Sequence, residues 1–96
     1  MADGTNAATH TGAIAYMATG DVLLSLLTSE SGVIGVTAGS GDSVTGAITD
    51  ITVLEAANLV TTGLVTLTAE TGIGATDAGD IDTTITTLQA TNNVSG

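Results

Sequence analysis

The chain has 96 residues and a formal net charge of −10 at pH 7, because its ten acidic residues are accompanied by no lysine or arginine. A chain of this length corresponds to one domain or to one part of a larger repeat protein. Without cationic side chains it cannot neutralise phosphate groups, so nucleic acids and anionic membrane surfaces are poor partners. The absence of cysteine excludes disulfides, thiolate nucleophiles and thiolate metal sites.

The composition favours β-structure around a narrow core. Apolar residues make up 43% of the chain, but Tyr16 is the only aromatic one, so Val, Ile, Leu and Ala must fill the interior. β-branched side chains suit strands, and 13 glycines without any proline suit the turns between them. The most apolar stretch, residues 22–27, is far shorter than the roughly 20 residues of a membrane-spanning helix, so no transmembrane segment is expected.

Six segments rich in apolar and β-branched residues are predicted to be strands. In chain order they are 13–17, 21–27, 32–38, 47–53, 63–69 and 81–90. Residues 53–60 are the one place where a helix can be argued, but so short a helix is not stable alone. We therefore expect a strand and a corner at that position.

The clearest strand is 63–69, in which Val65, Leu67 and Ala69 share one face and threonines share the other. Segment 32–38 has the same alternation, and both segments end on alanine before a polar turn. The two segments are therefore predicted to be copies of one structural unit.

The last predicted strand, 81–90, changes the phase of its alternation. Ile81 and Ile85 follow a period of two, and a shift by one position is then needed to bring Leu88 and Ala90 to the same side. Such a shift is typical of a β-bulge.

A hydroxyl residue followed by glycine recurs along the chain and predicts corner turns between strands. The spacing between Gly12 and Gly32 is close to the coil length of solenoid repeats. The other spacings are less regular, so we expect the coils to vary by insertion. The pairs are Thr11-Gly12, Thr19-Gly20, Ser31-Gly32, Thr45-Gly46, Thr62-Gly63, Thr71-Gly72 and Ser95-Gly96.

The two ends of the chain also resemble each other. Residues 90–96 are similar to residues 6–12, which suggests one long period that takes up most of the chain. On this basis residues 1–11 are predicted to be an N-terminal tail or the end of a preceding repeat, and residues 12–96 a single solenoid repeat unit.

Two strings, GLVTLTAETGIG at 63–74 and GDIDTTITTLQATNNVSG at 79–96, resemble the repeats of giant bacterial surface proteins of the filamentous-haemagglutinin type. The resemblance implies an all-β fold, a right-handed parallel β-helix (β-solenoid) segment of about four coils, uncapped at its ends. It also implies an extracellular or cell-surface location. The chain departs from that group in holding one repeat and in lacking lysine and arginine.

Three carboxylates, Asp77, Asp80 and Asp82, lie close together along the chain and form the best candidate for a metal site. Oxygen ligands of this kind suit calcium. Asp and Gly residues in this order also make an ordinary corner turn, and the full ligand pattern of an EF-hand is absent. No other cofactor is expected.

Catalysis is not predicted, because His10 stands in a polar segment without an activating motif beside it. The pairs Thr66/Thr68 and Thr84/Thr86 have the Thr-x-Thr pattern that resembles the ice-binding faces of antifreeze proteins. Threonine is equally a good strand former on a solvated face, which accounts for both pairs without a ligand.

Taken together, these features predict a structural subunit or repeat of an extracellular, self-associating β-solenoid fibre or adhesin stalk. Its partners would be further copies stacked head to tail or neighbouring repeats of the same protein, since uncapped coil ends present unpaired backbone groups. Tyr16 and Met17 are expected in a core or a stacking interface. The alternative is a solenoid that displays a binding site for ice, a glycan or calcium.

Overall fold

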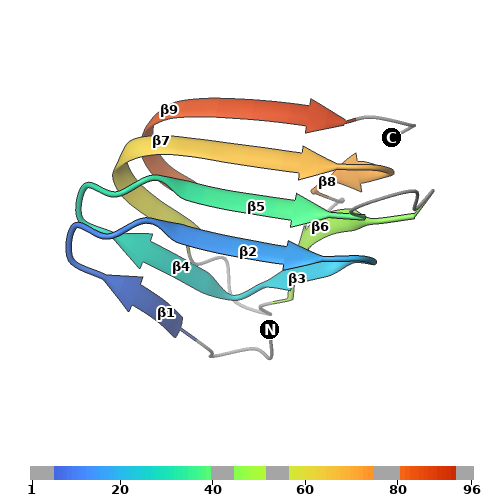
Figure 1. Cartoon of the computed structure of the whole chain (residues 1–96), viewed down its shortest axis with the longest axis horizontal. Coiled ribbons are helices and arrows are strands. Elements are labelled where there is room, and N and C mark those ends of the chain that lie inside the picture. Colours follow the sequence, from blue (N-terminus) through green and yellow to red (C-terminus); the bar gives the residue numbers. More distant parts are fainter. Residues whose placement is uncertain (1–5, 40–44, 52–56, 75–80, 93–96) are drawn as a thin grey trace.

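Strands account for all the regular secondary structure that the computed structural model describes, which covers residues 6–39, 45–51, 57–74 and 81–92. Figure 1 shows them stacked in layers from the first strand to the last. The first layer holds β1 (Asn6–Thr9), β2 (Ile14–Ala18) and β3 (Val22–Leu24), and the second holds β4 (Leu26–Ser29), β5 (Ile34–Ala38) and β6 (Ala47–Asp50). The third holds β7 (Leu59–Ala69) and β8 (Gly72–Ile73), and β9 (Thr83–Asn92) follows.

Every strand pair is parallel, and each strand lies on the equivalent strand of the preceding coil. One sheet has the order β1-β4-β7-β5-β2, with β9 paired to β7, and the other has the order β3-β6-β8. Because β7 and β9 each continue across two sides, the chain forms a three-sided β-solenoid of three turns, and β9 begins another (Figure 1). The predicted all-β parallel solenoid is confirmed.

The two segments predicted to be copies of one unit lie directly on each other. In the register of β5 and β7, Ile34 pairs with Val65 and Val36 with Leu67. All four side chains point inward and are at most 2% exposed. Since burying one such side chain stabilises a fold by roughly 1.5–3 kcal/mol, these rows supply much of the core. The apolar core consists of Val22, Leu24, Leu27, Ile34, Val36, Ala38, Ile48, Leu59, Val65, Leu67 and Ala69.

The apolar stretch predicted as one strand over 21–27 is two strands that meet at a corner. β3 ends at Leu24 and β4 begins at Leu26, with Ser25 between them. Leu24 and Ser25 are both buried although they are consecutive, so the alternation breaks there and the chain turns to the next side. The single strand was wrong because the apolar run hides this change of phase.

Glycines form a column at the corner between the β1-β4-β7 side and the β2-β5-β7 side. A Cβ atom on Gly32 would collide with the carbonyl oxygen of Gly12 in the coil below. A Cβ atom on Gly63 would lie 2.6 Å from the Ser31 oxygen and 2.7 Å from the Gly32 oxygen. Real Cβ atoms do not approach backbone this closely, so the hydroxyl-Gly corners are confirmed here and glycine is required by contact between coils.

The hydroxyls that fix this corner stand shortly before the glycine in the chain. Ser29 Oγ accepts a hydrogen bond from the Gly32 N–H at 2.9 Å and donates one to the Gly12 oxygen at 3.1 Å. Thr61 Oγ1 likewise accepts from the Gly63 N–H at 3.0 Å and donates to the Gly32 oxygen at 2.7 Å. Each buried hydroxyl therefore joins its own coil to the one below.

Coil length varies at the corners while the sides stay in register. Leu26 lies on Asn6 and Ile34 on Ile14, and the two pairs have the same separation along the chain. Ile48 lies on Val22 at a longer separation. Additional residues therefore fall between β5 and β6. Leu59 lies on Leu27 at a still longer separation, so further residues fall between β6 and β7, which confirms that the coils vary by insertion.

The predicted phase shift in the last strand is also present. The register of β7 and β9 changes between Thr61 and Leu64, and beyond that point Leu88 lies on Val65 and Ala90 on Leu67. In the two similar segments 90–96 and 6–12, the described residues do not occupy equivalent places in the coil. Ala90 belongs to the side formed by β2 and β5, whereas residues 6–9 belong to the side formed by β1 and β4.

Candidate functional site

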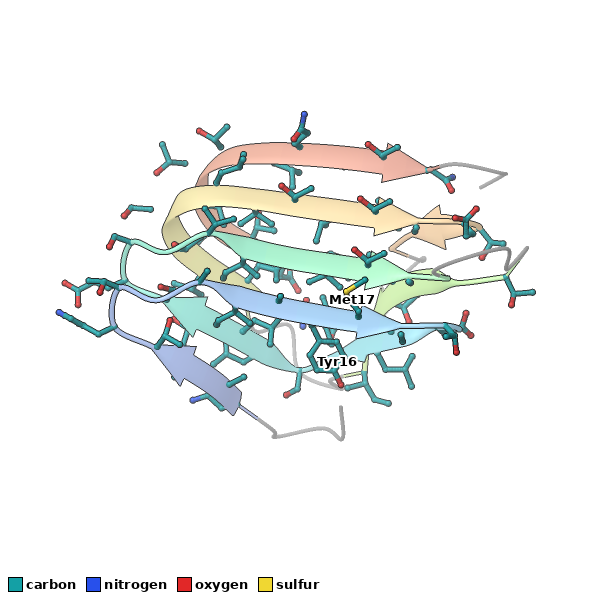
Figure 2. All side chains as sticks on the ribbon, in the orientation of Figure 1. Tyr16 and Met17 are labelled. Atoms are coloured by element: carbon teal, nitrogen blue, oxygen red, sulfur yellow. The ribbon has the colours of Figure 1, made fainter. Side chains whose placement is uncertain are left out.

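The end of the stack formed by the first coil has inward-facing side chains that are incompletely covered. Ile14 and Tyr16 are half-buried, whereas Ile34 and Val36, which occupy the same positions one coil later, are 0% and 1% exposed. Figure 2 shows the Tyr16 ring below β2 at this edge of the stack, away from β5. No described strand pairs with the outer edges of β1 and β2. This end therefore presents both backbone hydrogen-bonding groups and apolar surface.

An open depression of about 420 Å³ lies beside Tyr16 where β2 turns into β3. Met17 is 68% exposed and Leu23 39% exposed at this depression. It is lined by Ala15, Tyr16, Met17, Ala18, Asp21, Val22 and Leu23. Tyr16 thus lies at an end of the stack, and Met17 lies on the outer face of β2 (Figure 2).

The opposite end of the stack is the outer edge of β9. Within the described part of the chain no strand covers this edge, and most residues of β9 are exposed. Leu88 is 50% exposed although it lies on the fully buried Val65. Ala90 is exposed although it lies on Leu67. Both ends of the solenoid therefore expose the kind of surface that the next coil covers elsewhere in the stack.

A column of buried polar groups follows the corner that precedes β4, β7 and β9. Asn58 is fully buried, and its Nδ2 donates to the Ser25 carbonyl oxygen at 2.8 Å and to Asp50 Oδ1 at 2.9 Å. Its Oδ1 accepts a hydrogen bond from the Asp82 backbone N–H at 2.9 Å. One side chain thus connects three successive coils. Sequence reasoning missed Asn58, although a polar residue directly before an apolar strand was the available signal.

Of the three carboxylates predicted to hold calcium, only Asp82 belongs to the described residues, and Asp77 and Asp80 lie outside them. Asp82 lies at the corner before β9, and its backbone oxygen accepts hydrogen bonds from the N–H groups of Asn58 and Leu59. Its Oδ2 is buried and has no hydrogen-bond partner among the described residues. Ranges 6–39, 45–51, 57–74 and 81–92 contain no group of three or more His, Asp or Glu residues close enough to hold a metal ion.

The two threonine pairs lie on different sides of the solenoid. Thr66 and Thr68 belong to the side that contains β2 and β5, and Thr66 has Gly35 below it and Gln89 above it. Thr84 belongs to the side that contains β1 and β4, and it lies on Val60. The Thr-x-Thr pattern is therefore not repeated from coil to coil on either side, as a flat ice-binding array would require.

The side formed by β1, β4, β7 and β9 carries an open depression of about 490 Å³ rich in hydroxyl groups. Its lining consists of Thr9, Thr28, Ser29, Glu30, Val60, Thr61, Thr62, Thr84, Ile85 and Thr86. Two of the hydroxyls in this lining, those of Ser29 and Thr61, are buried in the hydrogen bonds of the glycine corner.

His10 pairs with Glu30 across two coils, with 2.5 Å between His10 Nδ1 and Glu30 Oε2. Both side chains are mostly exposed, 79% and 68%, so water and salt screen the pair. The arrangement is that of a surface contact between corners.

No protein-family model, no curated protein and no solved structure matches the chain. The β-solenoid structure agrees with the resemblance to filamentous-haemagglutinin repeats at the level of the fold, and membership of that family stays a prediction. No helix long and apolar enough to cross a membrane occurs in the portions described.

Proposed function

We propose that this protein is a structural module of an extracellular β-solenoid fibre or adhesin stalk, and that it assembles end to end through its coil ends. The observation that carries the proposal is the exposure of inward-facing side chains at both ends, with Leu88 at 50% and Tyr16 half-buried. Between the ends, the same positions are buried by the next coil. A second set of coils would bury these surfaces in the same way.

Backbone pairing adds to this apolar contribution. A free strand edge is a row of unpaired donors and acceptors, and such an edge readily adds a further strand. In a β-solenoid each coil contacts its neighbours, so the addition of a coil repeats an interface that the fold already contains. The ends are therefore suited to growth along the stack axis.

Charge opposes the association of copies at low ionic strength. The formal net charge of −10, with no lysine or arginine, makes copies repel one another. Salt weakens this repulsion because the Debye length falls from about 30 Å at 0.01 M to about 10 Å at 0.1 M. We expect assembly to increase with ionic strength. The proposal includes neither catalysis nor a required cofactor.

Sedimentation velocity over a range of protein and salt concentrations, together with electron microscopy, tests this function. The expected result is a concentration-dependent series of species that lengthen along one axis and become more abundant with salt. Dispersed monomers at high concentration in moderate salt would contradict the proposal. Labelling of intact cells that express the full protein tests the extracellular location.

A second candidate function is display of a ligand-binding surface on the same scaffold. The depression on the β1-β4-β7-β9 side, lined mainly by Ser and Thr residues, is the surface considered for a glycan. Calorimetry with oligosaccharides and with calcium, and thermal hysteresis for ice, test the three options separately. Absence of binding heat and of hysteresis would exclude this candidate.

A further inference from the structure

We propose a specific head-to-tail joint, in which β1 and β2 of one copy add as parallel strands to β9 of a second copy, with Ile14 over Leu88 and Tyr16 over Ala90. This inference rests on the proposed end-to-end assembly and assigns its register and polarity. The occupant of each exposed end is thus the opposite end of another copy of this chain.

The register follows from the columns of inward-facing residues within the chain. Ile14, Ile34, Val65 and Leu88 are successive members of one column. When the column continues into a second copy, the residue that follows Leu88 is that copy's Ile14. Large aliphatic side chains then meet throughout, as they do between the inner coils, and the joint is continuous with the coil interfaces of the fold.

The neighbouring column shows complementary sizes at its two ends. Its members are Tyr16, Val36, Leu67 and Ala90, so the largest residue stands at one end and the smallest at the other. Protein interiors are densely packed, and a change of volume at one position must be balanced at its neighbour. In the joint the Tyr16 ring lies over the Ala90 methyl group, which leaves room for the ring.

Backbone directions define the polarity of the joint. The Ile14 N–H donates to the Val33 oxygen and the Ala18 oxygen accepts from the Gly39 N–H, so these groups of the first coil face the second coil. Since N–H and C=O groups alternate in direction along a strand, those of Ala15 and Met17 face outward. Only a copy presenting β9 in the same direction continues this parallel pattern. Joints of this heterologous kind produce open filaments.

The end surface is of modest size. The stack axis is vertical in Figure 1, so the end extends over about 34 × 20 Å, the longest and shortest dimensions of the molecule. An area of this order is comparable with the roughly 800 Å² per partner of standard protein interfaces. Single substitutions at the joint are therefore expected to have measurable effects.

Two variants, each blocked at one end, provide the test. Ala90→Asp places a carboxylate on the exposed β9 end, and Tyr16→Asp places one on the first-coil end. Each variant alone is expected to remain monomeric, because every possible joint then buries a charge. A mixture of the two variants contains one unmodified pair of ends and is expected to form 1:1 dimers that do not grow further. Sedimentation velocity measures the size of these species. Circular dichroism first shows that both variants are folded.

A volume exchange tests the register even if one charged variant fails to fold. Tyr16→Ala and Ala90→Tyr are each expected to weaken association by about tenfold, equivalent to roughly 1.4 kcal/mol, and the double variant is expected to recover most of the loss. Met17→Ala, on the outer face of the same strand, is the matched control and should associate like the unmodified chain.

The outcomes separate the joint from the function on which it rests. An unmodified chain that stays monomeric at all concentrations overturns the proposed function and the joint together. Self-association of the unmodified chain with no recovery in the volume exchange, or with growth beyond dimers in the mixture, overturns this joint alone.

Discussion

The inner coils and the last strand have the same alternation of side chains but very different environments. Val65 and Leu67 in β7 are at most 2% exposed, because β5 lies below them and β9 above. Leu88 and Ala90 in β9 continue the same two columns and are exposed. In a solenoid, the pattern within a strand decides which side chains point inward, and the neighbouring coils decide whether those side chains are buried.

Removal of one inward-facing leucine from each of the two strands gives the sharpest test of this difference. Leu67→Ala is expected to lower the free energy of unfolding by about 2–5 kcal/mol, since it leaves a cavity between two coils. Leu88→Ala should cost less than about 1 kcal/mol in the dilute monomer, because half of that side chain already contacts water. Urea unfolding followed by circular dichroism measures both, and equal losses would contradict a core that is confined between coils.

The buried polar column around Asn58 gives the second comparison between an inner and an outer position. Asn58→Ala removes the donor to Ser25 and Asp50 and the acceptor of the Asp82 N–H. We expect a loss of at least about 2 kcal/mol, because buried polar groups lose their partners. Asn6→Ala, at an exposed position of β1, is the control and should leave the unfolding midpoint within error.

Substitution in the glycine column is expected to lower the unfolding free energy by a smaller amount, and a glycine on the following strand provides the control. Gly32→Ala forces a methyl group against the backbone of Gly12 and is expected to cost about 1–3 kcal/mol. Gly35→Ala introduces a methyl group with nothing within 4 Å, and alanine restricts the unfolded chain more than glycine does. Gly35→Ala should therefore be neutral or slightly stabilising, and a loss equal to that of Gly32→Ala would show that coil contact is not the cause.

The smallest effect is expected at the surface pair between His10 and Glu30. His10→Ala should change the unfolding free energy by less than about 0.5 kcal/mol, because a contact between two exposed polar side chains contributes little. Thermal unfolding at low and high salt measures this contribution. If His10→Ala lowered the unfolding free energy as much as Asn58→Ala, the contact between His10 and Glu30 would be structurally important, contrary to this prediction.

Much of the fold could be predicted from the sequence where alternation is regular. The matching patterns around Ile34 and Val65 predicted two copies of one unit, and the structure places them in direct register. The corner at Ser25 could not be predicted in the same way, because an apolar run looks alike whether it continues or turns. A turn without glycine is visible only as two consecutive buried residues.

The candidate site was harder to predict because it depends on which coils are neighbours. Tyr16 was expected in a core or a stacking interface, and only the register shows that it shares a column with Ala90. Asp82 was grouped with nearby aspartates along the chain, whereas its described contacts are with Asn58 and Leu59 in the coil below. Contacts between coils join residues that are a whole coil apart in the sequence, and spacing along the chain gives no direct sign of them.

The additional residues between β5 and β6 have a consequence for how such proteins can change. They lengthen one coil, yet the three sides keep their stacking, since Val22 still lies beneath Ile48 and Ile48 beneath Ile73. The entropic cost of a longer connection between strands rises only slowly with its length. Sequence can therefore be added at this corner without changing the rise from one coil to the next, which makes it a natural position for inserting a peptide epitope or an enzyme-recognition tag.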